Sequence, residues 1–217
     1  MRGGALHRGT LSPRVAFDVD GVLADSIHGF VRLALRETGA DLAELGRFDD
    51  YADPFTPWPE RFRPQVQDLF QRAYFGGEHG VYGDADVIPG ALEGVWTLHA
   101  AGIAGGYVTR RPDTLNALTR AWLERHGVPE LPVHPAPKGI GKAPQVRALH
   151  ASVMVEDAPI EADALAAAGV TVLLRHEPYN ASFDAPGVER CDGWPAIARR
   201  ALVLAGGGRS APALAGG

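Results

Sequence analysis

Cysteine is nearly absent from this sequence of 217 residues, in which Cys191 is the only one. A single cysteine can form neither an intrachain disulfide nor a cysteine metal cluster. This scarcity is typical of proteins of the reducing cytoplasm, where we expect this one to be located. Long apolar runs are also missing: there is no stretch of about 18 apolar residues, and the start of the sequence lacks the apolar core of a signal peptide. We therefore expect neither a membrane span nor a cleaved secretion signal.

Strong charge of one sign is absent as well. The formal net charge is −5, and no block of lysine and arginine stands out. These features argue against a nucleic-acid polymer as the main partner. The eight histidines show none of the spacings that are typical of zinc sites, so no zinc site is supported.

What the sequence does contain is an alternation of β-type and helical segments. This order predicts an α/β fold, with a parallel sheet covered by helices on both faces. The expected strands cover residues 14–19, 103–108, 152–155 and 170–174. The expected helices cover residues 26–38, 64–75, 91–101, 113–126, 142–150, 159–168 and 194–204.

The composition also divides the chain into segments. Residues 1–13 are predicted to be a flexible leader and residues 205–217 a disordered, low-complexity tail. Residues 40–88 contain nine of the chain's seventeen aromatic residues and interrupt the alternation. We therefore predict a small helical insertion at residues 26–88, and a core made of residues 14–25 and 89–204. The aromatic residues either form the insertion's own core or stack on a ligand.

The most informative motif follows the first expected strand, where Asp18 and Asp20 precede Gly21. Residues i and i+2 of a strand point the same way, and the glycine allows a sharp turn after them. Two such carboxylates can bind a hard divalent cation, or divide nucleophilic and acid/base work between them. An EF-hand is excluded, because its fifth position would be Val22 and its twelfth position Gly29.

The run Phe-Asp18-Val-Asp20-Gly-Val resembles the first motif of the haloacid dehalogenase (HAD) superfamily, most of whose members are Mg²⁺-dependent phosphatases. The resemblance implies a three-layer α/β/α Rossmann-like core, with a small helical cap inserted after the first strand. It also implies that Asp18 attacks phosphorus to form an aspartyl-phosphate, and that Asp20 is the general acid and base. Mg²⁺ would be held by Asp18, the carbonyl of Asp20 and Asp157.

Two other expected strands end in residues that suit phosphoryl transfer. Thr109 follows one apolar run and matches the second HAD motif, although a threonine there also commonly caps a helix. Arg110, next to it, is either a phosphate ligand or a solvated side chain. Glu156 and Asp157 follow another apolar run, where adjacent acids repel unless a positive group neutralises them. They match the fourth motif, with Glu156 acting through water or a lysine, while Asp157 also suits a helix cap.

The resemblance further requires a lysine that neutralises the nucleophile and the phosphate. Lys138 and Lys142 are both candidates. Lys142 begins the helix that precedes the strand ending at Glu156-Asp157, and this placement matches the third HAD motif better. We therefore assign the role to Lys142, with Lys138 as the alternative.

Within the superfamily, the sequence resembles the 5′(3′)-deoxyribonucleotidase-like branch most closely. The resemblance rests on the run Asp18–Asp25, on Val-Thr109-Arg-Arg-Pro and on Pro-Tyr179-Asn180. It implies a phosphatase for a small phosphorylated metabolite, with a nucleoside 5′-monophosphate as the favoured substrate. Three alternatives remain. The substrate can be a sugar phosphate or phosphoglycolate, the activity can be that of a phosphomutase or phosphotransferase, or the protein can be non-catalytic and only bind metal or nucleotide.

Overall fold

The structure is a computed structural model that describes residues 14–74, 80–136 and 139–206. In these residues six strands form one sheet, in the order β3-β2-β1-β4-β5-β6, and every neighbouring pair is parallel. The predicted α/β fold with a parallel sheet is therefore confirmed. The strands are β1 (Arg14–Phe17), β2 (Ala104–Thr109), β3 (Val133–Pro135), β4 (Ala151–Glu156), β5 (Thr171–Arg175) and β6 (Val188–Cys191).

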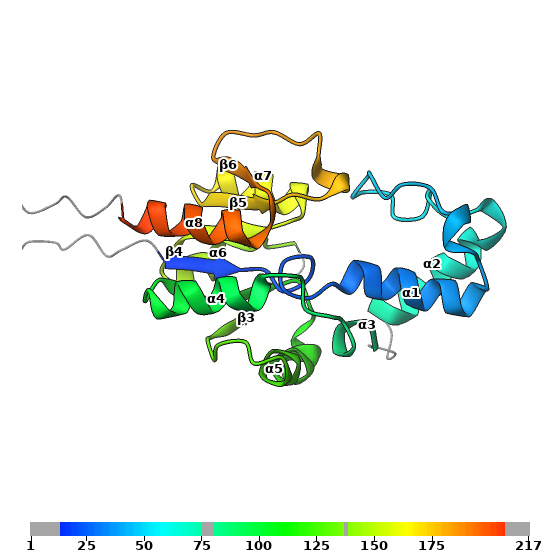
Figure 1. Ribbon diagram of the computed structural model, residues 1–217, viewed down its shortest axis with the longest axis horizontal. Helices are drawn as coiled ribbons and strands as arrows, with labels where there is room; N and C mark the ends of the chain where they lie inside the picture. The colour runs from blue at the N-terminus through cyan, green and yellow to red at the C-terminus, as the bar shows by residue number, and fades with distance from the viewer. Residues whose placement is uncertain (1–13, 75–79, 137–138, 207–217) are drawn as a thin grey trace, which may run out of the picture.

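Helices cover both faces of this sheet. Successive residues of a strand point to opposite faces, so neighbouring residues of β1 pack in two different buried clusters. Val15 and Phe17 pack in one buried cluster with α4 (Ala91–Ala100), α5 (Asn116–Arg125) and α8 (Gly193–Gly206). Ala16, between them, packs in a second cluster with α6 (Ala143–Ala148) and α7 (Pro159–Ala167). Figure 1 shows α4 and α8 running alongside β1. The core is therefore a three-layer α/β/α arrangement.

Residues 26–88, between β1 and α4, form a separate group of helices beyond the carboxyl end of β1 (Figure 1). This group contains α1 (Ser26–Thr38), α2 (Arg63–Tyr74), α3 (Gly80–Gly83) and the 3₁₀ helices η1 (Leu42–Glu44) and η2 (Glu60–Phe62). We call residues 26–88 the inserted segment. It has its own apolar cluster, in which the ring centroids of Phe30 and Phe70 lie 5.3 Å apart. The insertion therefore folds around its own small core.

In the described residues, two strands and the α-helix α3 were not predicted. β3 and β6 are the edge strands of the sheet, with three and four residues, and both carry polar side chains. Such short, partly exposed strands give no apolar run to detect. The helix α3 has four residues and follows residues 75–79, which lie outside the described part of the chain.

The predicted terminal segments are only partly described. The helix α8 continues to Gly206, so residues 205 and 206, which were predicted to belong to a disordered tail, are helical. The predicted leader, residues 1–13, and residues 207–217 lie outside the described residues, as does Lys138. No helix in the described ranges is both long and apolar enough to cross a membrane.

Candidate active site

The candidate site lies at the carboxyl ends of three adjacent strands, β2, β1 and β4. Because these strands are parallel, the residues that follow them meet at one edge of the sheet, where open α/β sheets bind their ligands. Asp18 follows β1, Thr109 ends β2 and Glu156 ends β4. The backbone N–H of Asp18 donates to the carbonyl of Val155 over 3.0 Å, which fixes the first aspartate beside the end of β4.

Lys142 joins the ends of β1 and β4. Its Nζ atom lies 2.6 Å from Oδ2 of Asp18 and 2.7 Å from Oε2 of Glu156. All three side chains are buried. Lys142 is the residue that precedes the helix α6, so the start of this helix places the ammonium group between the two carboxylates.

The buried charges at this point are unbalanced in favour of the acids. Burial and the charge of Glu156 raise the pKa of Asp18 well above its ordinary value, against the opposing effect of Lys142. Burial, and then the charge of Asp18, raise the pKa of Asp157 to about 7. Burial alone would lower the pKa of Lys142, but Asp18 and Glu156 raise it instead. The cluster therefore contains three buried carboxylates and one ammonium group, which contacts two of them.

The same carboxylates fit a hard cation. Asp18, Glu156 and Asp157 each offer an oxygen atom, and these atoms lie within 4.8 Å of one another. Oxygen ligands of this kind are what Mg²⁺ and Ca²⁺ require, and a divalent cation would neutralise the excess negative charge. The backbone comes unusually close here: a Cβ atom on Gly21, where φ is +75°, would lie 2.1 Å from Oδ2 of Asp157. The site therefore requires glycine at position 21.

Asp157 is held in place by residues that follow β5. The hydroxyl of Tyr179 donates to Oδ2 of Asp157 over 2.5 Å. The side-chain amide of Asn180 donates to the backbone carbonyls of Asp157 and Arg175, at 2.9 and 2.8 Å. Tyr179 and Asn180 appear in the sequence only as a subfamily resemblance, and their hydrogen bonds to Asp157 were not predicted.

Asp20 forms an ion pair that was also not predicted. Both of its carboxylate oxygens accept from Arg111, with Nε 2.8 Å from Oδ2 and Nη2 2.7 Å from Oδ1. The Arg111 side chain is 1% exposed, whereas that of Asp20 is 25% exposed. The pair Arg110-Arg111 is visible in the sequence, but nothing there indicates which arginine turns inward.

Thr109 and Arg110 are placed differently from Asp18. Thr109 is buried, and its hydroxyl accepts from the backbone N–H of Arg111 over 3.1 Å. It is not one of the described residues that line the cavity between this edge of the sheet and the inserted segment, which we call the main cavity, whereas Arg110 is. The guanidinium of Arg110 pairs with Glu161 of α7, with Nε 2.7 Å from Oε1. Glu161 therefore balances the charge of Arg110 at the cavity wall.

A cavity of about 460 Å³ opens between the sheet edge and the inserted segment. Asp18, Asp20, Lys142 and Asp157 line its core side. The inserted segment contributes mainly aromatic rings to the other side: Phe30, Phe48, Tyr51, Phe55, Phe70 and Tyr74. Several of these rings also pack against the insertion's own apolar cluster. The aromatic residues thus serve the insertion's core and the cavity wall at the same time.

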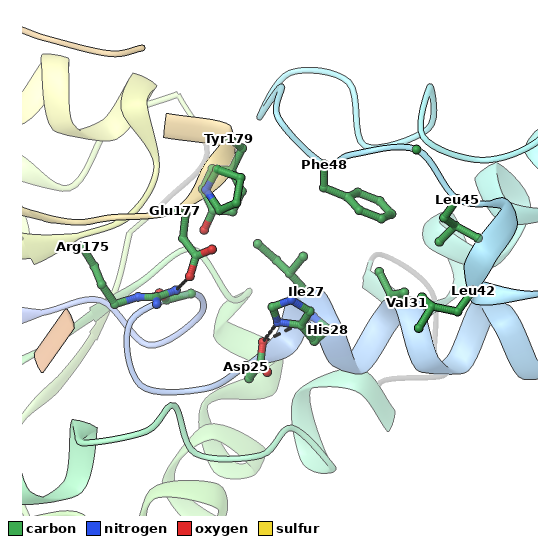
Figure 2. A pocket seen from close by; sticks show the side chains of 13 residues that line it. Asp25, Ile27, His28, Val31, Leu42, Leu45, Phe48, Arg175, Glu177 and Tyr179 are labelled. Atoms are coloured by element: carbon green, nitrogen blue, oxygen red, sulfur yellow. Dashed lines mark hydrogen bonds and ion pairs between the residues drawn. The ribbon is translucent and has the colours of Figure 1, made fainter. Parts of the chain in front are cut away.

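A second cavity of about 350 Å³ adjoins the first, and the two share Gly21, Ile27, Val31, Phe48 and Tyr179. Figure 2 shows Phe48 and the apolar side chains of the inserted segment on one side, and Glu177 and Tyr179 on the other. Two ion pairs, Asp25–His28 and Arg175–Glu177, also line it, and His28 is the one member of these pairs that belongs to the inserted segment. The ring of Tyr179 contacts the ring of Tyr51, with centroids 5.7 Å apart. Tyr179 therefore connects the acidic cluster with both cavities and with the inserted segment.

Sequence comparison finds one relative among curated proteins at a significant level. The chain is 31% identical over 116 residues to a protein from Oceanobacillus iheyensis whose name provisionally calls it a nucleotidase. The match covers 52% of this chain and 58% of that protein, so the chain spans little more than half the length of the curated relative. No family model matches the sequence.

Solved structures resemble the chain over most of its length. A HAD family hydrolase from Deinococcus radiodurans R1, crystallised with phosphate and sodium, has a TM-score of 0.57 and 20% identity, covering 90% of this chain and 98% of its own. A predicted phosphoglycolate phosphatase from Haemophilus somnus has a TM-score of 0.53 and 17% identity, covering 88% and 99%. A protein from Thermotoga maritima that is provisionally named a β-phosphoglucomutase has a TM-score of 0.51 and 16% identity, covering 88% of this chain and 98% of its own. At these identities the similarity shows a shared fold.

Proposed function

We propose that this chain, which has the fold of the HAD family hydrolases, is a Mg²⁺-dependent phosphomonoesterase that acts through an aspartyl-phosphate. One observation carries the proposal. Asp18 lies buried at the end of β1, 2.6 Å from the ammonium group of Lys142 and beside the carboxylates of Glu156 and Asp157. A nucleophilic carboxylate, a cation and further acidic ligands are the components that phosphoryl transfer to a side chain requires.

The proposed reaction has two steps. First, an Oδ atom of Asp18 forms a bond to phosphorus while the bond from phosphorus to the leaving oxygen breaks, and Asp20 gives that oxygen a proton. In the second step Asp20 takes a proton from water, the water oxygen bonds to phosphorus, and Asp18 is released. Lys142 neutralises charge on the phosphoryl oxygens, and Thr109 and Arg110 are proposed to bind and orient the same group.

We assign the metal site to Asp18, the backbone carbonyl of Asp20, and Asp157. Glu156 accepts from Lys142 and from the backbone N–H groups of Asp157 and Ala158, so it is proposed to support the site indirectly. When Mg²⁺ is bound, it offsets negative charge on the phosphoryl oxygens and on the acidic cluster. Inorganic phosphate and a sodium ion are bound in the Deinococcus radiodurans relative, and we extend only the idea of a phosphate and cation site to this chain.

The inserted segment is proposed to be a cap over a catalytic core made of residues 14–25 and 89–204. Its aromatic side chains face the cavity that contains Asp18, where a planar leaving group can stack on them. We therefore propose a nucleoside 5′-monophosphate as the substrate, in agreement with the provisional name of the Oceanobacillus iheyensis relative. A small sugar phosphate or phosphoglycolate is the second candidate, because relatives of the same fold carry those names. The reducing cytoplasm stays the proposed location, on the single cysteine alone.

A phosphatase panel tests this proposal. The purified full chain is assayed with p-nitrophenyl phosphate, with Mg²⁺ and with EDTA, and then with nucleoside monophosphates, sugar phosphates and phosphoglycolate. We expect Mg²⁺-dependent release of phosphate, with the highest kcat/KM for a nucleoside 5′-monophosphate, and no activity in the Asp18→Asn variant. Turnover that favours a sugar phosphate would change the substrate but keep the chemistry. A lack of turnover across the whole panel would favour a protein that only binds metal or nucleotide.

A further inference from the structure

Arg111 engages Asp20 in a way that fixes the orientation of the carboxylate. Its planar guanidinium donates from Nε to one oxygen and from Nη2 to the other. A single cation such as a lysine ammonium can fix only a distance, whereas this fork also sets the plane of the carboxylate. Asp20 remains partly exposed and lines the same cavity as Asp18, so its carboxylate is not fully enclosed by this contact.

Arg111 is itself held from several directions. Its guanidinium carbon lies 4.6 Å from the ring centroid of Tyr82 and 6.0 Å from that of Trp122. Its Nη1 atom donates to the carbonyl of Tyr82 over 3.4 Å, and its backbone N–H donates to Thr109. Tyr82 belongs to α3 of the inserted segment, and Trp122 belongs to α5 of the core. Arg111 is therefore anchored to both parts of the molecule and has little freedom to turn.

We propose that Arg111 is a positioning residue that holds Asp20 in the orientation needed for proton transfer to the leaving oxygen. The inference rests on the function proposed above. A carboxylate offers about four lone-pair positions, and Arg111 uses one on each oxygen, so each oxygen keeps a second position that can hold a proton. As the P–O bond breaks, a proton moves from Asp20 to the leaving oxygen. In the second step Asp20 takes up another proton from the attacking water. Arg111 acts only through Asp20.

This role predicts a dependence on the leaving group. An alkoxide is a poor leaving group and needs a proton, whereas p-nitrophenolate leaves as a stable anion. The ratio kcat/KM reports the first chemical step and not the later hydrolysis of the intermediate. The alkyl phosphate used is the nucleoside monophosphate, sugar phosphate or phosphoglycolate with the highest kcat/KM in the panel. For Arg111→Gln we expect kcat/KM on this substrate to fall about 100-fold or more, which is the lower end of the acceleration that a general acid supplies. On p-nitrophenyl phosphate we expect it to fall less than about tenfold, since little proton transfer is needed there.

The experiment measures kcat/KM on both substrates for the wild type, Arg111→Gln, Arg111→Lys, Asp20→Asn and the double variant Asp20→Asn/Arg111→Gln. Arg111→Lys retains the buried positive charge that supports folding but loses the fork, so we expect it to show the same difference between substrates. We expect the double variant to be no worse than Asp20→Asn, because Arg111 has no separate role. Arg120→Gln, an exposed arginine on α5, is the matched control and is expected to leave both values unchanged.

The outcomes separate this inference from the proposed function. An inactive wild type would overturn the phosphatase proposal and this inference with it. An active wild type whose Arg111 variants lose the same factor on both substrates would overturn only the inference, since a structural role lowers both rates together. Multiplying effects of Asp20→Asn and Arg111→Gln in the double variant would also overturn it.

Discussion

Nζ of Lys142 lies 2.6 Å from Oδ2 of Asp18, and the two side chains are almost fully buried. The contact joins the end of β1 to the residue that precedes α6. Because Glu156 shares the same ammonium group, a single lysine balances two strand ends. This contact positions the proposed nucleophile.

Removing the ammonium group should affect both activity and stability. In Lys142→Met the carboxylates of Asp18 and Glu156 lose their shared cation, and breaking a buried pair costs about 3–5 kcal/mol. We expect the free energy of unfolding at pH 8 to fall by about 3 kcal/mol and phosphatase activity to disappear. At pH 5 the loss of stability should be smaller, because the carboxylates can take up protons. Urea unfolding at the two pH values measures this.

Lys138→Met is the matched control for that variant, because Lys138 and Lys142 are the only two lysines of the chain. We expect Lys138→Met to keep both activity and stability. If Lys138→Met abolished activity and Lys142→Met did not, the assignment of the third-motif lysine would be reversed.

The pKa of Asp157 predicts how the metal-free protein responds to pH. Burial and the charge of Asp18 raise this pKa from 3.8 to about 7 in the folded state. Between these values the folded protein binds more protons at this site than the unfolded chain does, so stability falls as pH rises from about 4 to about 7. We expect the melting temperature in EDTA to fall across this window.

Two further measurements test whether Asp157 is the group that makes the melting temperature depend on pH. Saturating Mg²⁺ should remove most of the slope, because the cation stabilises the ionised carboxylates. Asp157→Asn should flatten the slope in EDTA, since an amide does not titrate. A melting temperature in EDTA that instead rises steadily with pH from 5 to 7 would show that the cluster does not carry excess negative charge.

Much of this arrangement was predictable from the sequence, for a simple physical reason. Asp18 and the pair Glu156-Asp157 each follow an apolar run, and the carboxyl ends of parallel strands must meet at one edge. The order of motifs along the chain therefore predicts that these residues come together. The predicted helix at residues 26–38 matches α1, which Asp25 caps and Gly39 ends in a left-handed conformation.

The contacts that depend on loop conformation were not predictable in this way. Arg111 turns toward Asp20 while its neighbour Arg110 pairs with Glu161, and both lie in the loop after β2, where no periodicity sets their directions. Tyr179 reaches Asp157 from a short 3₁₀ helix, Pro178–Asn180, for the same reason. The roles of all these residues in catalysis stay predictions until they are measured.

Two effects should make Gly21 irreplaceable, and a substitution at a second glycine, Gly102, separates them. A Cβ atom there would collide with Asp157, and the φ of +75° is also unfavourable for other residues. Gly102 has a similar φ of +73°, but a Cβ atom on it would have no neighbouring atom within 4 Å. We expect Gly102→Ala to cost about 1–2 kcal/mol and keep activity, and Gly21→Ala to cost more and lose Mg²⁺ binding.

Calorimetric titration with Mg²⁺, alongside urea unfolding, measures both glycine variants. Equal effects of the two substitutions would mean that backbone strain alone matters, and that the close approach to Asp157 does not.

The hydroxyl of Tyr179 should tune metal affinity. It donates to Oδ2 of Asp157, and groups that hold a metal ligand typically change affinity by about 10–100-fold when they are removed. We expect Tyr179→Phe to weaken Mg²⁺ binding about tenfold, as measured by calorimetric titration. Tyr51→Phe is the control, because it removes a hydroxyl from the ring that contacts Tyr179 and leaves Asp157 alone. Unchanged Mg²⁺ affinity in Tyr179→Phe would contradict this account of the acidic cluster.

The most direct measurement of the central claim is an acid-quench experiment with radiolabelled acetyl phosphate and Mg²⁺. If Asp18 is the nucleophile, the wild type will carry a protein-bound phosphate that hydroxylamine releases, and peptide mapping will locate it at residue 18. The Asp18→Asn variant will carry none. Rapid phosphate release by the wild type with no label at Asp18, or full activity in Asp18→Asn, would contradict the proposed mechanism.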